Sequence, residues 1–338
     1  MGGDIMHSNN SNGSRAACAG GFMAFFAVTL AMWLGLIARP AEAAPFAYVA
    51  NGGSNTVSVI DTATKTVVAT VGVGSVPDGI AVTPDGTHVY VANSSSDTVS
   101  VIATATNTVV GLPIPVGVIP VGVAFTPDGT RAYVTNFASN SVSVIRTDTR
   151  TVVKTVPVGT GAEAVAVTPD GTHVYVANFI SNTVSVLARP GNALVATIPV
   201  GNAPSWIAFT PDGTRAYVAN KSSDTVSVIR TDINTVVHTV GVGTNPVGVA
   251  VAPDGAHAYV ANQGSNNVSV IARPGNMVVA TVPVGTAAES VAVTPDGKHV
   301  YVANRDSANV SVIHTATNRV VATIPVGSIP FAVSISAQ

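Results

Sequence analysis

A tetrapeptide that returns at a nearly constant interval constrains the fold of this chain more than any other feature. It reads Tyr-Val-Ala-Asn, or once Tyr-Val-Thr-Asn, and successive copies are 42 residues apart except for one interval of 43. The seven copies begin at Tyr48, Tyr90, Tyr133, Tyr175, Tyr217, Tyr259 and Tyr301. A period near 40 residues that contains several short strand-like segments is typical of the blades of a β-propeller. The sequence therefore predicts an all-β, seven-bladed propeller.

Each repeat divides into four strand-like segments. In the repeat that starts near residue 121, these segments are 121–125, 131–136, 141–145 and 151–156. Thr-Pro-Asp-Gly at 126–129 separates the first two, and Pro, Asp and Gly in this order are typical of a tight turn. We call the strands a, b, c and d in chain order, with a innermost. The pattern predicts four antiparallel strands per blade.

The two ends of the chain predict how the ring closes. The first repeat begins directly at its b segment, residues 46–51, and has no a segment before it. The C-terminal segment, residues 330–336, matches an a segment and then stops. We expect the C-terminal strand to pair with the N-terminal blade, which removes the unpaired edges of a linear array. Residues 44–338 are thus predicted to form a single domain.

Composition excludes one class of partner. Only 9% of the residues are charged, the formal net charge is -2, and the Lys and Arg residues form no cluster. Binding to nucleic acid depends on many Lys and Arg side chains that meet phosphates. We therefore expect no nucleic-acid partner.

The N-terminal segment has the features of a secretory signal. The run 16–38 is uncharged and mostly apolar, and it precedes Ala41-Glu42-Ala43, a small-x-small cleavage pattern. We interpret residues 1–43 as a signal peptide cleaved after Ala43. An uncleaved anchor is the alternative, because a membrane span needs about 20 apolar residues, and it would be the protein's one contact with a membrane. Both interpretations place the domain outside the cytoplasm, in the periplasm, at the cell surface or secreted.

Cysteine chemistry is excluded from the mature chain by the same cleavage. Cys18 is the one cysteine of the sequence, and it lies within the apolar run. A mature chain without cysteine can form neither a disulfide nor a thiolate site.

The repeat resembles a known family. Tyr-Val-Thr-Asn at 133–136, with flanking Ser-x-Thr-Val-Ser-Val-Ile and Thr-Pro-Asp-Gly patterns, is similar to the YVTN-repeat β-propellers of exported and cell-surface proteins of bacteria and archaea. The resemblance covers nearly all of residues 46–338. It implies the propeller fold and an exported location. Similar propellers serve as lactonases and as parts of oxidoreductases, and the repeat motif itself contains no catalytic residue.

Side chains that break the repeat are the candidates for function, because a ligand needs particular groups rather than seven equal ones. The b–c loops and d–a crossings share one face, here called the top face. Four apolar side chains of adjacent blades interrupt the pattern there: Phe137, Phe179, Ile180 and Trp206. They predict either an exposed contact patch or side chains that fill the seams between blades.

Charged side chains break the pattern on the same face. Asp78, Glu163 and Glu289 stand where other repeats have Val or another uncharged residue, and Lys221 and Arg305 stand in b–c loops. The three acids are two, three and two blades apart, which predicts either a negative potential around the channel mouth or three solvated carboxylates. Direct metal coordination by side chains on separated blades is not expected, since metal ligands must converge on one point.

The histidines predict neither a metal site nor a catalytic site. Four of them recur at one repeat position near the bottom-face turns, on separate blades: His88, His173, His257 and His299. No Ser-His-Asp set, Gly-rich phosphate loop or HExxH motif is present. We therefore assign no catalytic residue and no metal ligand.

Two classes of function remain. The first, which the scarcity of unique polar groups favours, is an exported non-enzymatic binding or cell-envelope scaffold without a cofactor, whose top face holds a protein, a glycan or another envelope component. The second is a lactonase- or lyase-like hydrolytic enzyme with a divalent cation at the channel mouth, held by acids such as Glu163 or Glu289.

Overall fold

The computed structural model describes residues 45–336, and all regular secondary structure in this part of the chain is β-strand. No helix that could cross a membrane occurs in this part of the chain. The predicted signal peptide, residues 1–43, lies outside the described residues. The strands form seven antiparallel sheets, so the predicted seven-bladed propeller is confirmed.

The first three blades include the one that joins the two ends of the chain. Blade 1 consists of β29 (Pro330–Ile335), β1 (Phe46–Asn51), β2 (Thr56–Asp61) and β3 (Thr66–Gly72). Blade 2 consists of β4 (Pro77–Val82), β5 (His88–Asn93), β6 (Thr98–Ala103), β7 (Thr108–Val109) and β8 (Ile114–Pro115). Blade 3 consists of β9 (Pro120–Phe125), β10 (Arg131–Asn136), β11 (Ser141–Arg146) and β12 (Thr151–Pro157).

The other four blades each have four strands in simple chain order. Blade 4 consists of β13 (Ala162–Val167), β14 (His173–Asn178), β15 (Thr183–Ala188) and β16 (Ala193–Pro199). Blade 5 consists of β17 (Pro204–Phe209), β18 (Arg215–Asn220), β19 (Thr225–Arg230) and β20 (Thr235–Gly241). Blade 6 consists of β21 (Pro246–Val251), β22 (His257–Asn262), β23 (Asn267–Ala272) and β24 (Met277–Pro283). Blade 7 consists of β25 (Ala288–Val293), β26 (His299–Asn304), β27 (Asn309–His314) and β28 (Arg319–Pro325).

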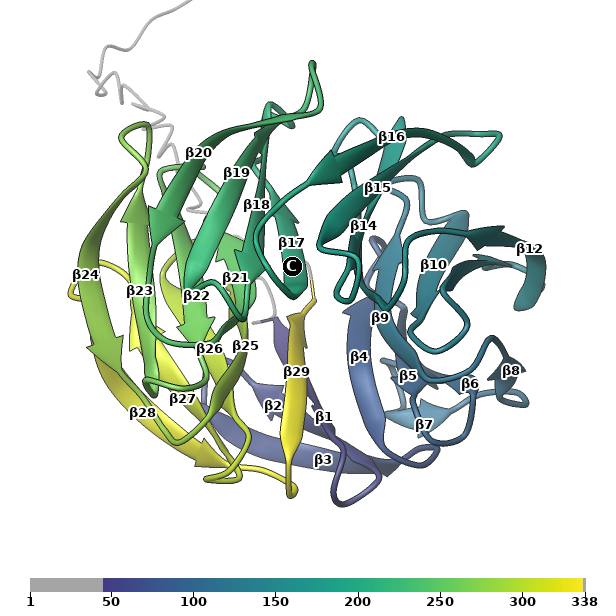
Figure 1. Ribbon diagram of the computed structural model, residues 1–338. Coiled ribbons are helices and arrows are strands. Elements are labelled where there is room, and N and C mark those ends of the chain that lie inside the picture. Colours follow the sequence, from purple (N-terminus) through teal and green to yellow (C-terminus); the bar gives the residue numbers. More distant parts are fainter. Residues whose placement is uncertain (1–44, 337–338) are drawn as a thin grey trace, which may run out of the picture. The chain divides into compact units, whose positions relative to one another are not determined.

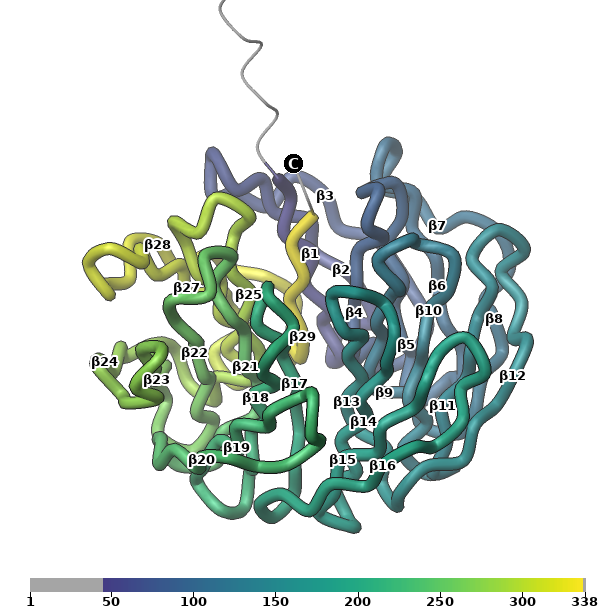
Figure 2. Tube along the Cα trace, turned by 90° about the horizontal axis from the view of Figure 1, so that it is seen from above, coloured from purple at the N-terminus to yellow at the C-terminus, as the bar shows by residue number. Residues whose placement is uncertain are grey.

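The ring is closed by the C-terminal strand, as the sequence predicts. β29 pairs with β1 from Ala47↔Ile335 to Asn51↔Pro330, and the two strands lie side by side in Figure 1. The innermost strands contact one another in the order β29, β4, β9, β13, β17, β21, β25 and again β29. Figure 2 shows the same ring from above.

The hydrophobic core lies in the seams between neighbouring blades. The cluster between blades 1 and 2, for example, joins Tyr48 and Val57 to Ile80 and Val91. Burying one such aliphatic side chain contributes about 1.5–3 kcal/mol. A seam therefore stabilises the ring only when both neighbouring blades are present.

The Thr-Pro-Asp-Gly segments form the predicted turns between a and b strands. In blade 2, Asp85 Oδ1 accepts hydrogen bonds from Thr83 Oγ1 at 2.6 Å and from the Thr87 amide at 3.0 Å. Gly86 follows with a φ of 70°, a conformation that favours glycine. The repeated aspartate thus has a local structural role, since its carboxylate holds the turn.

The interval of 43 residues disturbs the outer strand of blade 2. Gly111, Leu112 and Pro113 interrupt this strand, which forms two short pieces, β7 and β8. Each piece pairs with β6 at two positions. Because this strand lies at the solvent edge of the blade, the loss of pairing and the proline are tolerated there.

Candidate ligand site at the channel mouth

The loops that carry the unusual side chains share the top face. Backbone hydrogen bonds join each b–c loop to the d–a crossing that precedes strand a of the same blade, as from Phe137 N to Ile119 O at 2.8 Å and from Lys221 N to Ala203 O at 2.9 Å. The second residue of each innermost strand follows directly after this crossing. The fold thus places this residue at the top end of the central channel.

Below this end, most side chains that line the channel are aliphatic. All seven innermost strands contribute to a cavity of about 470 Å³ whose lining is mostly Val, Ala and Ile. The strands can approach closely because several have glycine near their start: a Cβ on Gly79 would lie 1.9 Å from the carbonyl oxygen of Val121. None of the described residues that line the cavity is charged, so the charged side chains that face the channel lie at its top end.

Trp206 lies in this channel. It lines the cavity and packs against the core clusters of three seams, between blades 1 and 2, blades 4 and 5, and blades 5 and 6. Contact with the seam between blades 1 and 2 requires the indole to reach across the channel from blade 5. The sequence left two alternatives for Trp206, an exposed contact patch or inward packing. The structure shows inward packing, with the indole in the channel below the mouth.

The two phenylalanines remain together on the top face. The Phe137 and Phe179 rings have centroids 6.2 Å apart and planes inclined by 57°. Ile180, in the same loop as Phe179, is 59% exposed, and Val118 and Ile119 in the adjacent crossing are 50% and 41% exposed. These residues, from blades 3 and 4, form an apolar segment of the rim.

Val118 and Ile119 were missed by the sequence analysis, although the sequence contains a signal for one of them. The other crossings have Ser, Thr or Asn at the position of Val118: Ser75, Thr160, Asn202, Thr244, Thr286 and Ser328. The signal for Val118 lies three positions before the residue that is equivalent to the acids, where a comparison of the seven crossings shows one apolar side chain among polar ones.

The three acids act on one another at the mouth. Burial raises the pKa of Asp78 well above its ordinary value, and the charges of Glu163 and Glu289 raise it further. Burial also raises the pKa of Glu163 to about 7, a rise that Lys221 opposes and Glu289 increases. All three side chains keep some accessible surface in the channel, while the surrounding walls displace water and penalise their charged forms. Carboxylates from blades 2, 4 and 7 therefore share one electrostatic environment.

Basic and amide side chains complete the opposite part of the rim. Burial raises the pKa of Glu289, while Lys221 and a hydrogen bond from Gln263 oppose the rise. Gln263 Nε2 donates this bond to Glu289 Oε2. Arg305 lies with its guanidinium carbon 5.8 Å from the centre of the Phe331 ring and its Nε 3.7 Å from Asp306 Oδ1.

The mouth thus joins three kinds of surface: an apolar rim from blades 3 and 4, a polar and basic rim from blades 5 to 7, and carboxylates in the channel end. Among residues 45–336, no three His, Cys, Asp or Glu side chains lie close enough together to hold a metal ion. Such a mouth can bind a cation through its carboxylates, and Glu163 can exchange a proton near neutral pH.

The structure is a seven-bladed β-propeller with a chemically asymmetric channel entrance, and comparison with known proteins agrees with the fold. The family model described as "Lactonase, 7-bladed beta-propeller" matches residues 113–237 and 234–322, together more than half of the chain. A second model, "YNCE-like beta-propeller", matches residues 8–155. The chain belongs to the lactonase-type seven-bladed β-propeller family.

Solved structures with the same fold have diverse descriptions. Hydrazine synthase of Kuenenia stuttgartiensis is 26% identical, with a TM-score of 0.74 over 80% of this chain and 92% of that chain. A putative 6-phosphogluconolactonase from Bacteroides uniformis is 19% identical, with a TM-score of 0.75 over 86% of this chain and 99% of that chain. A functionally unknown protein from Desulfotomaculum acetoxidans is also 19% identical, with a TM-score of 0.77 over 87% and 99%. A search of curated proteins gave no significant match.

Proposed function

We propose that this protein is an exported binding propeller whose channel mouth receives a cationic side chain, such as lysine, from a protein partner at the cell envelope. The observation that carries the proposal is the convergence of Asp78, Glu163 and Glu289 on one environment, with Lys221 as the cation that acts on both glutamates. The raised pKa values mean that these acids are held in a site that disfavours their charged forms, and each proton lost adds negative charge there. An incoming cation relieves their mutual repulsion.

The apolar rim supports a protein rather than a free ion as the partner. Phe137, Phe179 and Ile180 offer aromatic and aliphatic surface on one side of the mouth. An apolar residue next to the partner's lysine would pack there, and aromatic residues are enriched at such contacts. Export is proposed from the signal-like segment 1–43, and it is consistent with the resemblance to YVTN-repeat surface proteins.

A matched pair of peptides tests this function. Acetyl-Leu-Lys-Leu-amide and its analogue with norleucine in place of lysine differ by the ammonium group alone, and calorimetry measures their affinities for the purified domain. We expect the lysine peptide to bind at least tenfold tighter, because a charge-assisted contact contributes about 1.5–3 kcal/mol. The double variant Glu163→Gln, Glu289→Gln should abolish this difference.

Asp232→Asn is the control, because Asp232 lies in a bottom-face turn where it pairs with Arg230 at 2.8 Å. It removes a carboxylate without touching the mouth. Equal affinity for both peptides, or equal loss in the control and the mouth variant, would refute the proposed site.

Hydrolysis of a lactone is the second candidate. It is favoured by the family match and by the pKa of Glu163 of about 7, which suits a general base near neutral pH. Glu163 would take a proton from water as the water oxygen attacks the lactone carbonyl, Lys221 or Arg305 would stabilise the oxyanion, and the ring alcohol would leave with a proton.

A lactone panel and a metal analysis of the purified protein separate the two candidates. Release of acid from a lactone that disappears in Glu163→Gln would establish the enzyme. A bound divalent ion would add the metal-assisted version, in which Glu163 or Glu289 holds the ion. The peptide assay is independent of both results, so binding and hydrolysis can be scored separately.

A further inference from the structure

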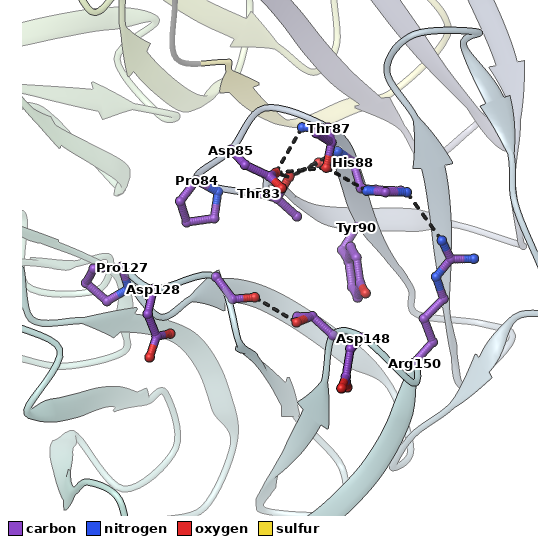
Figure 3. A pocket seen from close by; sticks show the side chains of 12 residues that line it. Thr83, Pro84, Asp85, Thr87, His88, Tyr90, Pro127, Asp128, Asp148 and Arg150 are labelled. Carbon is purple, nitrogen blue, oxygen red and sulfur yellow. Dashed lines mark hydrogen bonds between the residues drawn. The ribbon is translucent and has the colours of Figure 1, made fainter.

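A second cavity lies on the bottom face, in the seam between blades 2 and 3. A cavity of about 500 Å³ opens there between the a–b turns of both blades and the c–d turn of blade 3 (Figure 3). The equivalent cavity between blades 4 and 5 is smaller, about 300 Å³. Because the blades are near copies, the other seams show which features of the larger cavity are special.

Arg150 is the residue that distinguishes this seam. It occupies a c–d turn position that has a positive φ in every blade, between 51° and 56°. The seven residues at this position are Lys65, Asn107, Arg150, Asn192, Asn234, Asn276 and Asn318. Asparagine tolerates this conformation better than arginine does. Blade 3 therefore holds a long cation in a strained turn where most blades have a short amide.

The replacement changes the partner of a buried tyrosine. In three other seams the amide oxygen accepts a hydrogen bond from the tyrosine of the preceding blade, as from Tyr133 to Asn192 at 2.7 Å and from Tyr217 to Asn276 at 2.6 Å. Arginine has donors but no acceptor. The Tyr90 hydroxyl therefore cannot donate a hydrogen bond to Arg150. It lies at the cavity, where it can donate a hydrogen bond to a ligand.

Arg150 itself has no carboxylate partner. Its guanidinium donates to Val110 O at 3.2 Å and to His88 Nε2 at 3.3 Å. In the described part of the chain, none of the ion pairs within 4 Å includes it. His88 Nδ1 lies 2.8 Å from Thr87 Oγ1, which in turn donates to Asp85. This row of hydrogen bonds, drawn in Figure 3, fixes the imidazole beside the guanidinium.

Two aspartates also line the cavity, Asp85 in the a–b turn of blade 2 and Asp128 in the a–b turn of blade 3. Asp85 and Asp128 each use Oδ1 for their own turns. Asp128 Oδ2 lies 3.9 Å from Arg189 Nη2, too far for a hydrogen bond. The Thr126 and Thr130 hydrogen bonds lower the pKa of Asp128 to about 2, so its carboxylate is charged at neutral pH. Asp148, also in the cavity wall, is already paired with Arg146 through bonds of 2.7 and 2.9 Å.

The cavity therefore offers the Arg150 charge and the Tyr90 hydroxyl, together with the carboxylates of Asp85 and Asp128, of which Asp128 also has Arg189 at 3.9 Å. We propose that it binds a small zwitterion, whose carboxylate pairs with Arg150 and Tyr90 and whose ammonium group pairs with Asp85 or Asp128. A simple anion meets the carboxylates, and a simple cation meets Arg150, so each is disfavoured by a like charge.

The test uses amino acids of increasing length as probes: β-alanine, 4-aminobutyrate and 6-aminohexanoate. Hexanoate and hexylamine each carry one of the two charges and serve as controls. Calorimetry on the intact domain should show at least one probe binding tenfold tighter than either control. Equal or weaker binding of all three amino acids would overturn the proposal.

Two variants locate the binding. Arg150→Asn gives blade 3 the residue that five other blades have at this turn, so the fold should tolerate it, and it should weaken the best probe at least tenfold. Tyr90→Phe removes only the hydroxyl and should weaken it less. Lys65→Asn is the matched control, because it removes one positive charge from the same turn of blade 1. Loss of binding in Lys65→Asn, or none in Arg150→Asn, would show that the probe does not bind in this cavity.

Discussion

At the scale of single residues, one position carries most of the protein's chemical individuality. The second residue of the innermost strand is Phe331, Asp78, Val121, Glu163, Ser205, Val247 and Glu289 in blades 1 to 7. The position is equivalent in each blade, but not every side chain enters the channel. Asp78, Glu163 and Glu289 share one environment, whereas Ser205 is buried and its hydroxyl donates to the Val247 carbonyl oxygen. Burial is the largest cause of the raised pKa values of the three acids, and the neighbouring charges modify them.

Glu163 predicts a characteristic dependence of stability on pH. Its pKa rises from an ordinary 4.5 to about 7 on folding, so the folded chain keeps a proton that the unfolded chain releases between these values. The free energy of unfolding should fall as pH rises through this window, by at most about 3 kcal/mol from this group. Glu163→Gln should therefore raise the melting temperature at pH 8 and change it little near pH 4.5, as calorimetric scans at the two pH values would show.

The turn aspartates affect the stability of the fold in a separate pH range. The pKa values of Asp128 and Asp212 are lowered to about 2, so the stability they contribute is lost only as pH falls below about 4. Above pH 5, the change of the free energy of unfolding with pH that is due to Glu163 can therefore be measured without a contribution from the turn aspartates. An identical slope in wild type and Glu163→Gln would mean that this glutamate is not buried as described.

The residues of the mouth were predictable to different degrees. The repeat places Asp78, Glu163 and Glu289 at equivalent positions, and pseudo-symmetry alone then predicts that they face one channel end. The direction of Trp206 was not predictable, because it depends on space across the channel between blades distant in sequence. Arg150 was missed for another reason: its importance appears only when the tyrosine partners of the other seams are known.

At the scale of elements, the outer strand of blade 2 is the weakest in the ring. β7 and β8 together pair with β6 at four positions, whereas β12 of the next blade pairs with β11 at six. Leu112, between the two pieces, is 88% exposed. The repeat with the extra residue thus has an outer strand that is divided in two.

Hydrogen exchange should detect this weakness. Amides in residues 108–115 should exchange faster than those in residues 151–157, because fewer ladder hydrogen bonds and fewer buried contacts protect them. Mass spectrometry of the two peptides after exchange measures the difference. Equal protection would contradict the divided strand.

At the scale of the whole molecule, the ring depends on a strand contributed by the end of the chain. β29 pairs with β1 and also contacts the innermost strands β25 and β4 on either side. A seam core needs both blades, so loss of one inner strand weakens two seams. The sequence predicted this closure because the first repeat lacks strand a, and the C-terminal segment, residues 330–336, supplies a strand of this type.

Removal of residues 330–338 should therefore abolish the single cooperative unfolding transition. The truncated chain exposes the edge of β1 and the core beside it, and a ring of repeats without closure unfolds in parts. Denaturant titration followed by tryptophan fluorescence and circular dichroism tests this. A chain shortened by residues 337 and 338 alone is the control, and a truncated chain with native cooperativity would show that closure is dispensable.

The most direct test of the proposed function is the affinity of the leucine-flanked lysine peptide at pH 6 and pH 8. With a pKa of about 7, Glu163 is mostly protonated at the lower value and mostly charged at the higher one, while lysine stays charged at both. We predict about tenfold tighter binding at pH 8. Equal affinity at the two pH values, or tighter binding at pH 6, would contradict the assignment of the acidic channel mouth as a cation-binding site.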